Sequence, residues 1–225
     1  MRSSRGCARS CRKVRRNDDA TRRFDVKQAV ASSLWASADC AEWRAALATY
    51  ETAVRGRGAS RLEELDAWVR NELPSAIASR TPKHVTKDEL VRVTEWKMKR
   101  GEWRARNLAL VRANTEDDVR AKSQAAFAAM PDVRKPIALL MELGGVGPAT
   151  ASAIAFHARP DVYPFFDEVI ALQIDGLGNV AFTLPYYLRY AERLRARASE
   201  LSAACTETWT AHGVGQALWA AANPA

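Results

Sequence analysis

The chain has 225 residues, 48% of them hydrophobic, so it is long enough to bury one substantial core. It contains no run of eighteen apolar residues, so the sequence predicts no membrane-spanning helix. The net charge is +8, but residues 1–25 hold nine Lys or Arg and three Asp and carry +6, which leaves +2 for the remaining 200 residues. The basicity therefore says little about the folded surface.

The N-terminal segment lacks apolar periodicity, so residues 1–25 are predicted to form a disordered basic tail before a folded domain over 26–225. The run Arg12-Lys13-Val14-Arg15-Arg16 suits a nuclear signal or a nonspecific DNA-binding arm. An Arg- and Ser-rich start also suits an organellar transit peptide. A nuclear or cytoplasmic location is expected, with organellar targeting as an open alternative.

The composition of the remainder favours an all-α domain, because Ala, Leu, Arg and Glu dominate and strand-like alternation is scarce. Thr86 and Glu89 predict a capping box, and Gly101 is expected to break the helix that follows it. In the first part of the chain, helices are expected near 26–36, 39–55 and 60–72, followed by a further turn to about 79. The next helix is expected from 86 to the Trp96 region, and another from beyond Gly101 to about 113. The remaining helices are expected over 115–129, over 135–143, from Pro148 onward, and over 168–174, 185–204 and 208–222.

A glycine turn between two short helices is the most informative local feature. Residues 135–143 predict an apolar helix, Gly145 and Gly147 allow the backbone to turn sharply, and Pro148 suits the first position of a second helix rich in small residues. The amides at the start of that second helix form a natural anion site, for which a DNA phosphate is the expected ligand. The predicted DNA contacts of the turn are Gly145, Val146, Gly147, Ala149 and Thr150.

This unit, Leu143-Gly144-Gly145-Val146-Gly147 with Asp167 at 22 residues after Gly145, resembles the helix-hairpin-helix (HhH-GPD) DNA glycosylase superfamily. The segments 95–108 and 164–168 are similar to its Amun-like branch, and the similarity runs from about Trp35 to the end of the hairpin. The resemblance implies two helical lobes with a cleft between them, a hairpin module over about 136–170, and N- and C-terminal segments that share one lobe.

The resemblance also implies an activity. Asp167 takes the place of the carboxylate that stabilises positive charge on the sugar as the base departs, a role that suits this residue type. Ala149 stands where bifunctional members carry a lysine, so the implied function is base-excision repair by a monofunctional DNA glycosylase. The expected partner is double-stranded DNA with a damaged or mismatched base, bound by a monomer without cofactor or metal.

Three alternatives remain open at this level. Glu168 follows Asp167 directly, so either carboxylate suits the site. Asp167 also suits the N-cap of the expected helix 168–174. A catalytically inactive helix-hairpin-helix DNA-binding protein with a nuclear regulatory or scaffold role would share the same motif.

A basic stripe lies upstream, where residues 97–112 hold six basic side chains and one acidic side chain, Glu102. Lys97, Arg100 and Arg104 are predicted to contact DNA phosphates, although a solvated helix face has the same pattern. Trp96, Trp103 and Leu110 recur at heptad spacing and are expected in the core.

The cysteines and aromatic residues favour structural roles. Cys40 and Cys205 are far from each other and from the tail pair Cys7 and Cys11, so no zinc-site spacing is present and four free thiols in a reducing compartment are expected. Six aromatic residues near the hairpin and beyond it are expected mainly in the core: Tyr163, Phe165, Phe166, Tyr186, Tyr187 and Tyr190.

Overall fold

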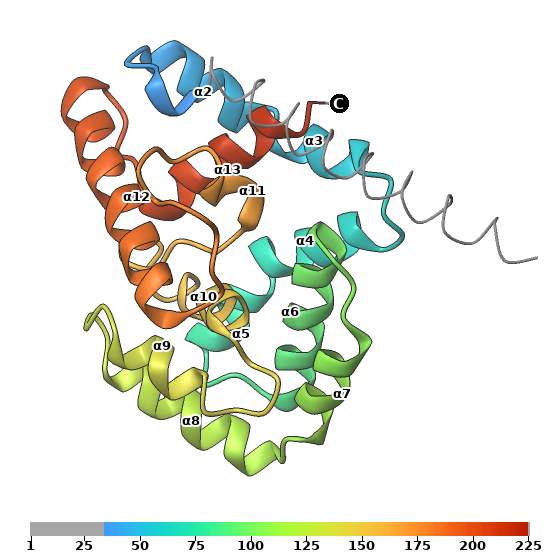
Figure 1. Ribbon diagram of the computed structural model, residues 1–225. Helices are drawn as coiled ribbons and strands as arrows, with labels where there is room; N and C mark the ends of the chain where they lie inside the picture. Colours follow the sequence, from blue (N-terminus) through green and yellow to red (C-terminus); the bar gives the residue numbers. More distant parts are fainter. Residues whose placement is uncertain (1–33, 225) are drawn as a thin grey trace, which may run out of the picture.

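The computed structural model describes residues 34–224 (Figure 1). All regular elements within this part of the chain are helices, which confirms the all-α prediction. The basic tail, with its targeting and DNA-arm signals, lies outside the described residues, as does most of the helix expected over 26–36.

The helices follow the expected order along the chain. They are η2 (Leu34–Ala36), α2 (Cys40–Ala48), α3 (Tyr50–Gly56), α4 (Leu62–Asn71), α5 (Leu73–Ala78), α6 (Lys87–Arg100), α7 (Ala105–Ala113), α8 (Glu116–Ala128), α9 (Lys135–Leu140), α10 (Pro148–Ala155), α11 (Glu168–Ala171), α12 (Leu184–Ala204) and α13 (Ala211–Ala222).

Local side-chain caps account for many helix starts. Thr86 and Glu89 form the predicted capping box at the start of α6, and Thr115 caps α8 through the amide of Asp118. Several predicted helices differ from the structure, since α9 ends at Leu140 rather than at Leu143 and α13 starts at Ala211 rather than near Thr208. The helix expected over 39–55 is divided at Thr49, and α11 ends at Ala171 rather than at Ile174.

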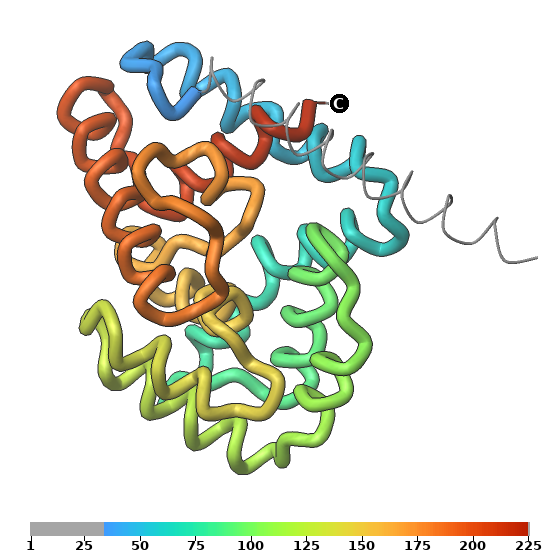
Figure 2. Tube along the Cα trace, in the orientation of Figure 1, coloured from blue at the N-terminus to red at the C-terminus, as the bar shows by residue number. Residues whose placement is uncertain are grey.

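The first and last helices of the described chain pack together. Helix α13 packs against α2, α3, α11 and α12, and Figure 2 shows α2 and α3 following one another along one end of the molecule, next to α13. The intervening helices form a second group, in which α6 packs against α4, α7, α8 and α10. A hydrophobic core runs without interruption through both groups, from Trp43 and Trp219 to Leu140 and Val119.

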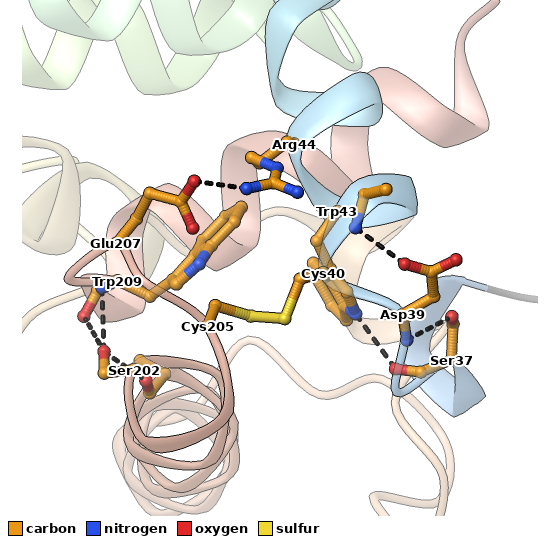
Figure 3. The surroundings of a disulfide bond; sticks show 11 residues. Ser37, Asp39, Cys40, Trp43, Arg44, Ser202, Cys205, Glu207 and Trp209 are labelled. Atoms are coloured by element: carbon orange, nitrogen blue, oxygen red, sulfur yellow. Dashed lines mark hydrogen bonds and ion pairs between the residues drawn. A yellow bond between two sulfur atoms is a disulfide. The ribbon is translucent and has the colours of Figure 1, made fainter.

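A disulfide bond between Cys40 and Cys205 joins the start of α2 to the residue that follows α12 (Figure 3). An ion pair between Arg44 and Glu207 lies beside it, and the ring of Trp43 packs edge-to-face against Trp209. The expectation that Cys40 and Cys205 are isolated free thiols is therefore wrong. Their separation of 165 residues hid a pairing that arises only when the ends of the described chain meet.

The heptad prediction fails after α6. Trp96 is buried as expected, but Trp103 and Leu110 are 49% and 46% exposed. Gly101 ends α6, and the chain is not helical again until Ala105, so residues on the two sides of this break do not share a helical face. The six aromatic residues expected in the core are all buried, as predicted.

Candidate functional site

One pocket, about 320 Å³ in volume, brings together most of the residues that the sequence singled out. It lies where the end of α6, the start of α10 and the segment before α11 meet. Six predicted site residues line it: Lys97, Arg104, Gly147, Ala149, Thr150 and Asp167. Its volume falls in the range of small-molecule and cofactor sites and is large enough to hold an extruded nucleobase.

The start of α10 supplies backbone donors to this pocket. Gly147 is the N-cap and contributes no side chain, and Pro148 has no amide hydrogen. No acceptor among residues 34–224 takes a hydrogen bond from the amides of Ala149 and Thr150. These two donors, with the positive end of the helix dipole, face the space that an anion would occupy.

Gly145 has a structural role in the turn. It takes a φ of +75°, and a Cβ at this position would lie 2.6 Å from the carbonyl oxygen of Asn107 and 2.9 Å from the backbone nitrogen of Val111. The glycine therefore allows the turn to pack directly on α7. Val146 is buried and its amide bonds to the carbonyl of Leu143. Neither residue lines the pocket, and their contacts with DNA stay a prediction.

Asn114, which the sequence analysis missed, fixes the turn to the end of α7. Its side-chain oxygen accepts a hydrogen bond from the amide of Gly144 at 2.8 Å, and its side-chain nitrogen donates to the Gly144 carbonyl at 2.9 Å. The same nitrogen donates to the carbonyl of Val111 at 2.9 Å. The side-chain amide of Asn114 therefore bonds to both backbone polar groups of Gly144. These bonds set the position of the turn relative to the basic stripe.

A buried extended segment delivers Asp167 to the pocket. Its backbone groups bond to side chains of two neighbouring helices: the amide of Phe166 donates to Ser152 of α10 at 2.9 Å, and Tyr190 of α12 donates to the carbonyl of Phe165 at 2.7 Å. Because the backbone before Asp167 is held at both faces, the position of its carboxylate is fixed by the core.

The carboxylate of Asp167 has two partners of its own. One oxygen accepts a hydrogen bond from the amide of Val169 at 3.0 Å, so Asp167 is the N-cap of α11. The other oxygen accepts from Nε of Arg100 at 3.3 Å. The side chain of Asp167 is 10% exposed, whereas Glu168 is an exposed residue of the same pocket. Both carboxylates thus face the pocket, in different environments.

Arg100 belongs to the interior, which corrects its predicted contact with DNA. Its side chain is 3% exposed, donates to the hydroxyl of Tyr50 at 2.5 Å and lies over the ring of Trp219, with 4.0 Å between the guanidinium carbon and the ring centroid. Asp66, also buried, accepts hydrogen bonds from Tyr50 and from the indole of Trp96. The sequence did not reveal this network because its members lie on four separate helices.

Lys97 and Arg104 carry the positive charge of the pocket. Burial, and then the nearby charge of Arg104, hold the pKa of the Lys97 amine below its ordinary value. Arg104 is exposed and pairs with Glu102 at 2.6 Å, an interaction that water screens strongly. The pocket therefore combines a half-buried amine, an exposed guanidinium and the carboxylates of Glu102, Asp167 and Glu168.

Phe182 is a pocket residue that periodicity could not have identified, because it lies in the loop before α12. It is 46% exposed and packs against Phe166 with 5.2 Å between ring centroids. The two rings are tilted by 39° to each other and give the pocket an apolar wall. An exposed aromatic residue beside a polar pocket suits contact with a planar ring.

No cluster of three or more metal-ligating side chains occurs within residues 34–224. No helix in this part of the chain is long and apolar enough to cross a membrane. In comparisons with protein-family models, curated proteins and solved structures, none matches this chain.

Proposed function

We propose that the protein is a DNA glycosylase that hydrolyses the N-glycosidic bond of a damaged or mismatched base. The observation that carries this proposal is the convergence of Asp167, the open amides of α10 and two basic side chains on one pocket that is large enough for a nucleobase. The α2–α3–α12–α13 group and the α4–α10 group would act as two lobes that hold the duplex.

The pocket explains how base release would be catalysed. As the bond between the base and C1′ breaks, positive charge develops on the sugar, and a preorganised carboxylate stabilises it. Asp167 is held rigidly in surroundings of low solvent exposure, where such an interaction is stronger than in water. Ala149 places no amine in the hairpin, so water is the proposed nucleophile for this step.

Phosphate binding would position the reacting sugar. The amides of Ala149 and Thr150, at the start of α10, would donate hydrogen bonds to a phosphate in the pocket that Asp167 also lines. Arg104 adds an exposed guanidinium across the opening. The target nucleotide would leave the base stack, at a cost of about a few kcal/mol, and place its base against Phe182.

The test is a base-release assay on duplexes that carry uracil, thymine mismatches, oxidised bases or alkylated bases. Asp167→Asn keeps the N-cap acceptor but removes the charge that faces Arg100, so its folding is checked by circular dichroism. In the folded variant, base release should fall by about 10² to 10³. Glu168→Gln is the matched control, because it removes the neighbouring, exposed charge of the pocket. Base release that survives Asp167→Asn but not Glu168→Gln would transfer the role to Glu168.

A second candidate function is supported by the partners of Asp167. A carboxylate already bonded to Arg100 and to the amide of Val169 is also what a purely structural cap would look like. In that case the protein would bind DNA without catalysis and act as a regulator or scaffold. Tight binding to the duplex panel with no base release from the wild type would favour this function over the first.

A further inference from the structure

We infer that the disulfide between Cys40 and Cys205 is a redox-sensitive switch, which a dithiol reductant opens and which thereby releases residues 34–48 from the rest of the fold. The bond joins the first residue of α2 to the C-cap of α12. Neither cysteine lines the candidate pocket. The inference therefore concerns a feature of the molecule that the proposed function does not use.

Apart from this bond, residues 34–48 have few attachments. Trp35 of η2 and Trp43 of α2 are the buried side chains of the segment, and its other residues are half-buried or exposed. Arg197 of α12 donates a hydrogen bond to the carbonyl of Trp35. A helix of 9 residues has marginal stability on its own, so α2 depends on its packing against α13 and on the disulfide. Local unfolding of this segment would therefore expose little of the core.

The noncovalent contacts beside the disulfide are weaker than the bond itself (Figure 3). Arg44 pairs with Glu207 at 2.6 Å, but the two side chains are 50% and 41% exposed, and water screens the pair. The ring of Trp43 packs edge-to-face against Trp209 with 6.0 Å between ring centroids. A disulfide between residues 165 positions apart, by contrast, strongly restricts the unfolded chain. Reduction therefore removes the strongest attachment of α2.

The chemistry of the switch is thiol–disulfide exchange. Cys40 and Cys205 are both half-buried, so a small dithiol in solution has access to the bond. A thiolate of the dithiol attacks one sulfur and forms a mixed disulfide, and the other cysteine leaves as a thiolate. The second thiolate of the reductant then displaces the first cysteine. The dithiol supplies two electrons and becomes a disulfide, and both cysteines take up a proton.

Helix α13 connects the switch to the pocket. It packs against α2 and carries Trp219, whose ring centroid lies 4.0 Å from the guanidinium carbon of Arg100. Arg100 in turn bonds to Asp167. Release of α2 uncovers part of α13, so reduction should loosen the position of this carboxylate and slow base release. This last step rests on the proposed function, whereas the release of residues 34–48 does not.

The experiment is amide hydrogen exchange of the full-length protein before and after reduction with dithiothreitol. The parent protein is the double variant Cys7→Ser, Cys11→Ser, in which Cys40 and Cys205 are the remaining cysteines. Alkylation and mass spectrometry count its free thiols. Reduction should accelerate exchange in α2 by about tenfold or more and leave exchange in α8, in the other group of helices, unchanged. Reoxidation should restore slow exchange in α2.

The matched control adds Cys40→Ser and Cys205→Ser to the parent, and its α2 should exchange fast with and without reductant. Three results would overturn the switch: free thiols at both positions before reduction, reduced thiols with unchanged exchange in α2, or equal acceleration in α2 and α8. Base release that does not change when α2 opens would overturn the coupling to Asp167. Absence of base release in both redox states would count against the proposed function and leave the switch standing.

Discussion

Arg100 and Asp167 lie 67 residues apart in the sequence, yet their side chains meet at the boundary between the core and the pocket, with 3.3 Å between Nε and Oδ2. Arg100 is fully enclosed by aromatic rings and by the Tyr50 hydroxyl, whereas the carboxylate of Asp167 still lines the pocket. The pair therefore couples the position of a pocket carboxylate to the packing of α3, α6 and α13.

Replacement of Arg100 should destabilise the protein strongly. Arg100→Met keeps much of the volume but leaves Asp167 and Tyr50 without a buried cationic partner, so we expect a loss of about 3 to 5 kcal/mol in the free energy of unfolding. Urea denaturation measures this change. Arg104→Met is the control: Arg104 pairs at the surface, and the change should stay within about 0.5 kcal/mol. Equal effects of the two variants would contradict the structural role of Arg100.

Much of the fold was predictable because its signals are local. The Thr86 capping box and the Thr115 cap lie within a few residues of the helix starts they set. Pro148 and the turn glycines placed the start of α10 in the same way. The position of Asp167 next to α10 was inferred from a family resemblance, not from any local rule.

The failed predictions depended on contacts between distant segments. Lys97 and Arg100 lie one helical turn apart in the same basic stripe, yet one lines the pocket and the other is enclosed by rings from α3 and α13. No periodicity within the stripe separates these outcomes. The same holds for Cys40 and Cys205, whose pairing depends on the meeting of α2 with the end of α12.

Substitution of Gly145 should affect stability, whereas substitution of Gly147 should affect DNA binding. A Cβ on Gly145 would overlap the backbone of α7 at a positive φ, so Gly145→Ala should cost more than about 1 kcal/mol in the free energy of unfolding. Gly147 has a φ of −99° and open space around it, so Gly147→Ala should leave stability nearly unchanged. Thermal denaturation compares them, and DNA binding should weaken in the folded Gly147→Ala protein. Similar melting temperatures for the two variants would contradict this assignment.

A buried histidine pair should make stability fall in acid. His212 stacks on the ring of Phe156 and His157 packs against the same ring at a tilt of 39°, and burial lowers the pKa of each histidine to about 3 from 6.5. The charges of His157 and Arg100 also lower the pKa of His212. The folded protein keeps both rings neutral while the unfolded chain takes up protons, so stability is complete above about pH 6.5 and declines as the pH falls toward 3.

Urea unfolding between pH 7.5 and pH 4.5 measures this decline. In that interval, each histidine lowers the free energy of unfolding by at most about 1.4 kcal/mol for each pH unit of acidification. The double variant His157→Gln, His212→Gln should have a shallower slope than the wild type, because Gln does not titrate. His84→Gln, which replaces the half-buried histidine before α6, serves as the control. A double variant whose slope matches that of the wild type would show that other groups dominate acid unfolding.

The salt dependence of DNA binding should separate Arg104 from basic residues elsewhere on the surface. Arg104 lines the pocket opening and gives up only a screened pair with Glu102 when it meets a phosphate. Each neutralised phosphate contributes about 0.9 to the slope of log K against log salt, so Arg104→Gln should flatten the slope by about that amount. Arg120→Gln, on α8 beside Glu116, should not change it. Titration of a labelled duplex by fluorescence anisotropy gives both slopes, and an unchanged slope for Arg104→Gln would mean that DNA does not reach the pocket opening.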